Sequence, residues 1–244
     1  MFYNFNTQPY IVINGRDSRT IKGLIISKLP PISKPMKRVN AEEIDGRDGD
    51  IITVLGYSAY DKTIEIGLSY EYNIDDIISF FNSSGRIVFS NEPDKYYKFS
   101  IYAQVDFEKL IRFKTASITV HVQPFKYSDS ENEKRVVDFG EYNSFTIRNS
   151  GNIYSRPILT ITGAGETEIY LNGSKILDIN FDTTGQTIVI DTIEMNATSE
   201  DGSTLLNRRI TGNYDNIRLR VGTNVISFVG VVSEFRVKLF SRWI

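Results

Sequence analysis

The fold of this chain is decided by residues 87–128, which read IVFSNEPDKYYKFSIYAQVDFEKLIRFKTASITVHVQPFKYS. Apolar runs in and beside this stretch predict three strands, at Arg86–Phe89, Tyr97–Val105 and Ile111–Gln123. In the last of them Ile118, Val120 and Val122 alternate with polar residues, as in a strand with one buried face. No cluster of acids, bases or metal ligands accompanies the strands. The stretch therefore indicates a building block before it indicates an enzyme.

A single helix is predicted, immediately before these strands, at Ile74–Phe81. Its apolar residues recur at i, i+3, i+4 and i+7, namely Ile74, Ile77, Ile78 and Phe81. Asn73 can cap the first turn, where Asp75 and Asp76 meet the positive end of the helix dipole. Because so short a helix is marginal alone in water, we expect it to pack on a sheet.

Residues 30–50, PPISKPMKRVNAEEIDGRDGD, are predicted to form an exposed arm or long hairpin. Three prolines near the start and a charged, glycine-containing end argue against a buried central strand. The arm interrupts a series of predicted strands, at Tyr10–Ile13, Thr20–Leu29, Ile51–Leu55 and Thr63–Leu68. Asn14-Gly15, between the first two, is a tight-turn dipeptide.

The second half of the chain is predicted to be β almost throughout. Residues 127–135 are polar and lack apolar periodicity, so we place a domain boundary there. Asn172-Gly173 predicts a hairpin between Thr167–Leu171 and Lys175–Phe181, and Gly163-Ala164-Gly165 is interpreted as a turn between two strands. Short strands with one apolar face and turns between them are typical of an antiparallel sandwich.

The composition agrees with a mainly β protein of two domains. Apolar residues make up 41% of the 244 residues and charged residues 24%, as in ordinary globular proteins. A net charge of −2 argues against a nucleic-acid binder. There is no cysteine, which excludes disulfides and cysteine-based zinc sites. We also expect no leader peptide and no membrane helix.

The residues that would carry chemistry have simpler interpretations. His121, the single histidine, lies within a predicted strand and is interpreted as a strand residue instead of a catalytic base. Asp45, Asp48 and Asp50 do not have the spacing of a calcium loop and are interpreted as a charged hairpin tip. We therefore predict no enzyme activity, no cofactor and no metal. A set of aromatic residues leaves sugar stacking open: Tyr70, Tyr72, Tyr142 and Trp243.

The order of the elements, together with several local sequences, resembles a known family. In the first half these sequences are RDGD at 47–50, SSGRIVFS at 83–90, NEPDKYYKFSIYAQV at 91–105 and ITVHVQPFKYS at 118–128. In the second half they are NSGNIYSRPILTITGAGETEIYLNG at 149–173 and VKLFSRWI at 237–244. The chain resembles the distal tail protein (Dit) of long-tailed, siphovirus-type bacteriophages, encoded by a phage or a prophage. Gln123-Pro124 departs from the Cys-Pro that the family often has there.

The resemblance implies two domains. Residues 1–128 would be an N-terminal ring-forming barrel or sandwich, with the helix at 74–81 and the arm at 30–50. Residues 136–244 would be a galectin-like β-sandwich. Candidate ring-interface residues lie on the arm: Lys37, Arg38, Arg47 and Asp48.

The resemblance also implies a structural hub at the tail tip or baseplate. It would form a hexameric ring that joins the major tail or tube protein to a tail-associated fibre or lysin protein. The tape measure and DNA would pass through the lumen without specific binding. The protein would be part of the virion, assembled in the cytoplasm of the bacterial host. The alternative is a carbohydrate-binding β-sandwich module, because a fold does not fix a function.

Overall fold

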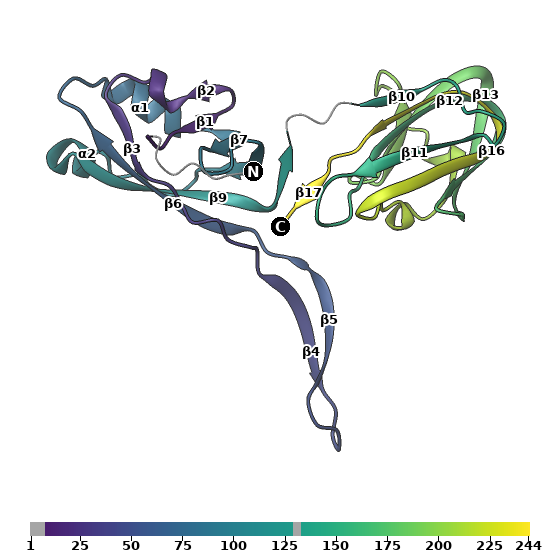
Figure 1. Ribbon diagram of the computed structural model, residues 1–244, viewed down its shortest axis with the longest axis horizontal. Helices are drawn as coiled ribbons and strands as arrows, with labels where there is room; N and C mark the ends of the chain where they lie inside the picture. Colours follow the sequence, from purple (N-terminus) through teal and green to yellow (C-terminus); the bar gives the residue numbers. More distant parts are fainter. Residues whose placement is uncertain (1–7, 129–132) are drawn as a thin grey trace. The chain divides into compact units, whose positions relative to one another are not determined.

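The computed structural model describes residues 8–128 and 133–244 (Figure 1). These residues fall into two compact units, 8–128 and 133–243, each with a hydrophobic core of its own. Strands dominate both units, which confirms the prediction of a mainly β protein. No helix in the described part of the chain is long and apolar enough to span a membrane.

The first unit is built on one curled antiparallel sheet with the strand order β2-β1-β7-β8-β9-β6-β3. Its strands are β1 (Ile11–Ile13), β2 (Arg16–Asp17), β3 (Leu24–Lys28), β6 (Tyr60–Leu68), β7 (Ser84–Phe89), β8 (Lys95–Ser100) and β9 (Thr115–Ser128). Ile118, Val120 and Val122 are fully buried, as their alternation predicted. A short 3-10 helix, η1 (Ser18–Thr20), follows β2.

The predicted helix is present as α1 (Ile74–Phe81), with a capped first turn. The Asn73 side chain accepts hydrogen bonds from the backbone N–H groups of Asp75 and Asp76, at 3.1 and 3.4 Å. The buried face differs from the predicted one, because Phe80 packs in the core while Ile78 is 36% exposed. Relative to the predicted orientation, the helix is therefore rotated about its axis, which leaves Ile78 at the surface.

A second helix, α2 (Phe107–Phe113), corrects the prediction of strands at Tyr97–Val105 and Ile111–Gln123. Strand β8 ends at Ser100, and β9 begins only at Thr115. The Asp106 side chain caps α2 by accepting a 2.9 Å hydrogen bond from Lys109 N, and Leu110 fixes the helix to the core. One capped turn and one buried leucine thus outweigh the β-forming residues around them.

The arm is a hairpin of β4 (Lys37–Glu43) and β5 (Asp50–Tyr57), which pair only with each other among the described strands. It is longer than predicted, because Ile51–Leu55 forms its second leg and not a strand of the body. Figure 1 shows the hairpin leaving the sheet of the first unit beyond β3 and β6.

The second unit is antiparallel, with the strand order β10-β16-β12-β13-β14; β11 pairs with β16, and β15 with β13. Its strands are β10 (Lys134–Val136), β11 (Ser144–Asn149), β12 (Ile158–Leu171), β13 (Ser174–Asp191), β14 (Asn196–Ser199), β15 (Ile210–Gly212), β16 (Gly222–Lys238) and β17 (Arg242–Trp243). Two 3-10 helices, η2 (Asn207–Arg209) and η3 (Tyr214–Asn216), lie between β14 and β16. The predicted hairpin at Asn172-Gly173 joins β12 to β13, with both residues at positive φ.

The sandwich of this unit is made by long strands that bend midway and continue into a second layer. Strands β12 and β16 change register near Gly163 and Gly230, and both halves of each strand contribute to one core. The glycines Gly163 and Gly165 are therefore a bulge inside β12, which corrects their interpretation as a turn between two strands.

Candidate functional site

The arm presents an apolar face to solvent. The register pairs Val39 with Val54 and Ala41 with Ile52, so these four side chains share one face of the hairpin. Val39 is 46% exposed, Val54 54% and Ile52 62%. The opposite face carries the polar Arg38, Asn40, Glu42 and Thr53 together with the apolar Ile51 and Leu55. A two-stranded hairpin is marginal on its own in water, and an exposed apolar face marks an interaction surface.

The tip of the arm is strongly acidic. Glu43 lies directly opposite Asp50 in the register, and like charges at such a position destabilise a hairpin. Five carboxylates and a single arginine lie in the stretch from Glu42 to Asp50. The turn is closed by a 3.1 Å hydrogen bond from Arg47 N to Ile44 O. The tip would therefore be stabilised by a positively charged partner.

The predicted interface residues lie at opposite ends of the arm. Lys37 and Arg38 are at its root, where the Arg38 guanidinium lies over Gly56, and Arg47 and Asp48 are in the tip. All four are exposed, but the structure does not bring them together. Sequence reasoning did not identify the apolar face between them. The alternation of Ile52 with Val54 was its signal.

The carboxylates of the acidic tip are spread along the hairpin. Asp45, Asp48 and Asp50 lie on the turn and the start of β5. Among residues 8–128 and 133–244, no three His, Cys, Asp or Glu side chains are grouped so as to hold a metal ion.

The segment that leads into the arm is fixed to the body by hydrogen bonds to its backbone. Lys62 Nζ donates to Pro31 O at 2.8 Å, Tyr60 OH to Ser33 O at 3.2 Å, and Asn91 Nδ2 to Pro30 O at 3.1 Å. The hairpin itself begins with a 2.9 Å bond from Ser58 N to Met36 O. The root of the arm is therefore held in place, while its legs stand free.

A buried cluster of charges lies beneath this root. Lys62, Glu92 and Lys126 are 4%, 4% and 6% exposed, respectively. Lys126 Nζ contacts Glu92 Oε1 at 2.8 Å, and Tyr97 OH donates to Glu92 Oε2 at 3.3 Å. Burial lowers the pKa of Lys62 to about 8; Lys126 lowers it further and Glu92 opposes the change. The sequence analysis missed this cluster, because its members meet only in the fold.

His121 lies on the solvent-facing side of β9, as predicted. Its Nδ1 is 2.7 Å from Asp61 Oδ1 on the paired strand β6, and its ring is 5.2 Å from that of Tyr102. This arrangement joins two neighbouring strands. A nucleophile is not among these contacts.

The aromatic residues considered for sugar stacking have different surroundings. Tyr70 is fully exposed and Tyr142 is 83% exposed. Tyr72 packs against the core of the first unit, with Lys114 Nζ 4.5 Å from its ring centroid. Trp243 is half-buried in β17. Tyr142 is therefore the best-exposed aromatic residue of this set in the second unit.

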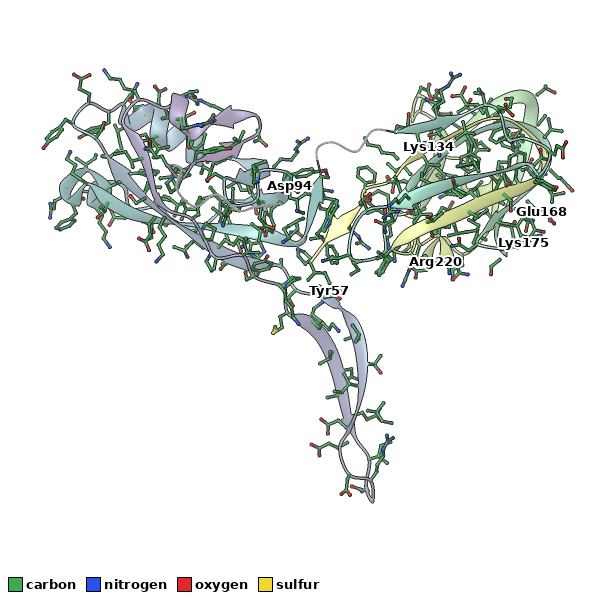
Figure 2. The ribbon with its side chains drawn as sticks, viewed as in Figure 1. Tyr57, Asp94, Lys134, Glu168, Lys175 and Arg220 are labelled. Atoms are coloured by element: carbon green, nitrogen blue, oxygen red, sulfur yellow. The ribbon has the colours of Figure 1, made fainter. Side chains whose placement is uncertain are left out.

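A polar groove of about 360 Å³ lies in the second unit, lined mainly by charged and polar residues of β12 and β13 and the segment 208–211. Many of its charges are already paired. Lys175 Nζ lies 2.7 Å from Glu168 Oε1 and 2.6 Å from Asp178 Oδ1, and Figure 2 shows Glu168 and Lys175 close together. Arg209 Nη2 lies 2.6 Å from Asp182 Oδ1. The groove therefore needs no ligand to balance these groups.

Comparison with known proteins shows a likeness in structure alone. No protein-family model and no curated protein matches the chain. Among solved structures, the chain superposes on the SPP1 Dit (gp 19.1) protein with a TM-score of 0.67 and 15% identity, over 96% of this chain and 100% of that one. Two structures of the phage P2 baseplate in its activated conformation, with Ca and with Sr, give TM-scores of 0.41 and 0.42 at 12% and 14% identity. They cover 94% of this chain and 97% of theirs. The chain thus has the fold of a phage distal tail protein, as its sequence motifs led us to expect.

Proposed function

We propose that this chain is a structural hub protein of a phage tail tip, whose work is assembly instead of catalysis. The observation that carries the proposal is the fold shared with SPP1 Dit over 96% of this chain and all of that one. SPP1 Dit is a paradigm of the hub adsorption apparatus in phages that infect Gram-positive bacteria. A virion component encoded by a phage or prophage is the corresponding role here.

In this proposal the first unit builds a hexameric ring and the second unit lies outside it. The exposed arm supports a ring, because a surface that contacts a different surface on the next copy closes into a ring when the rotation allows. One face of the ring would dock the tube protein, and the other would bind the tail-associated protein. The tape measure and DNA would pass through the lumen.

The proposal is tested by the mass of the purified protein in solution. Light scattering is expected to give six times the chain mass of 27.8 kDa. Replacing residues 38–56 by Asn-Gly keeps the root of the arm and removes its legs, so this variant is expected to have the mass of one subunit.

A matched control removes exposed apolar side chains elsewhere. Val229 and Val231 of β16 are 61% and 63% exposed, and their double change to serine should leave the sixfold mass unchanged. A full-length chain that remains a single subunit at high concentration would contradict the ring. An armless variant that still forms the ring would instead contradict the role of the arm in it.

The carbohydrate-binding alternative is favoured by one feature, the exposed Tyr142 of the second unit. It predicts a single subunit that binds a glycan saturably, with the binding lost on Tyr142→Ala. A glycan array with the full chain and this variant distinguishes the two functions.

A further inference from the structure

The first unit has an apolar groove that is a candidate binding surface for the arm of another copy. The groove has a volume of about 390 Å³ and lies between α1 and the segment that leads into α2. Its large apolar lining residues are Ile78, Phe81, Ile101, Tyr102, Val105 and Phe107, with Asn82 and Ala103 between them. Ile78 is 36% and Tyr102 71% exposed, so the groove is open to solvent.

The arm of the same copy begins at the end of β6 that is remote from the end of α2, and it runs away from α1 and α2 (Figure 1). Tyr60, at the root of the arm, pairs with Val122, whereas Gly67 pairs with Thr115, directly after α2. Seven residues of β6 separate these two ends, which is about 23 Å. Side-chain hydrogen bonds from Tyr60 OH and Lys62 Nζ to the backbone of the segment that leads into the arm hold its root in this direction.

The charges of the two surfaces are complementary. The tip of the arm places Glu43 opposite Asp50. In α2, Glu108 is paired with Arg112 at 3.0 Å and Asp106 caps the first turn, which leaves Lys109 and the following Lys114 as the basic groups of this surface.

The distance between the apolar and charged residues is also similar on the two surfaces. The pair Val39–Val54 lies four residues from the tip, about 13 Å, and Phe107 lies seven helical residues from Lys114, about 10 Å.

We propose that the hairpin of one copy lies in the groove between α1 and the segment that leads into α2 of the next copy. This inference rests on the proposed hub function and names the surface that receives the arm. Val39, Ile52 and Val54 cover the apolar groove, and the acidic tip lies along Lys109 and Lys114. The contact is heterologous and has a direction, which is the geometry that a closed ring requires.

Cysteine pairing between copies tests the contact directly, because the chain has no cysteine of its own. Ile52→Cys is placed on the arm and Tyr102→Cys at the rim of the groove. Mixing the two single variants under mild oxidation is expected to join chains in pairs, since a disulfide needs Cα atoms within about 7 Å. Ile52→Cys mixed with Val229→Cys, an equally exposed site on the second unit, is the matched control and should give no such product.

A charge exchange provides the second test. Asp50→Lys is expected to raise the concentration needed for half-assembly at low salt by about tenfold, and Lys109→Glu should do the same. The two variants combined in one chain should assemble as well as the original, because the exchanged charges meet again across the contact. Loss of assembly in the combined variant would overturn the proposed contact.

The outcomes separate this inference from the function on which it rests. A sixfold mass without the Ile52–Tyr102 product would overturn the groove and leave the hub function standing. A disulfide formed only between Ile52→Cys and Val229→Cys would also overturn the groove, because the arm would then contact the second unit. A chain that never oligomerises would overturn both.

Discussion

Lys62 is buried at the root of the arm, and its titration should be visible in the stability of the protein. Its pKa is about 8 in the folded state and 10.5 in an exposed lysine, so the unfolded chain binds more protons between these pH values. Stability should therefore rise from pH 8 to pH 10.5. In Lys62→Met this rise should disappear, and the variant should be more stable at pH 7 by about 1–3 kcal/mol. Urea unfolding across this pH range measures both effects. A variant that keeps the rise would assign it to another group.

The position of Lys62 could be predicted from the sequence, but its partners could not. Ile64 and Ile66 alternate in phase with it, and this period of two places the lysine on the buried face of β6. Glu92 and Lys126 lie on other elements, about 30 and 60 residues away along the chain. Only the strand pairing brings these charges together, and no local pattern encodes that pairing.

The bends of the long strands depend on glycine at the element scale. Gly230, in β16, has a φ of +125°, and a Cβ there would lie 2.6 Å from Glu166 O. Gly230→Ala should therefore destabilise the second unit by roughly 2–4 kcal/mol. Gly222→Ala, in the same strand, is the matched control: its φ is +87° but no atom lies within 4 Å of the added Cβ, so it should cost only about 1–2 kcal/mol. Equal losses in urea unfolding would show that crowding at the bend is unimportant.

Elements with a complete local signal were predicted, and those decided by their surroundings were not. Asn73 and the apolar spacing identified α1, and Asn172-Gly173 identified the hairpin of β12 and β13. The second helix, α2, is only seven residues long and contains β-forming Phe and Ile, so its cap at Asp106 was not recognised in the sequence. The second leg of the arm resembled a body strand, because Ile51–Leu55 is apolar in sequence whether or not it is covered.

At the scale of the whole molecule, sequence reasoning identified the fold class and the arm but not the face that the arm presents. A strand with an apolar sequence is normally assigned to a hydrophobic core. Exposure of such a strand follows from where the chain turns, and the turn here comes at the acidic tip, between Glu43 and Asp50. The candidate site therefore depends on an apolar face whose second leg, Ile51–Leu55, was predicted as a strand outside the arm.

The two units should separate without losing their folds, and only the first should assemble. Each has its own hydrophobic core, so residues 1–128 and residues 130–244 are expected to fold when produced alone. Residues 1–128 hold both the arm and the groove and should form the sixfold assembly. Residues 130–244 should remain a single subunit. Light scattering of both pieces, with circular dichroism to check folding, measures this. A folded first piece that stays single while the full chain assembles would place the ring contacts in the second unit.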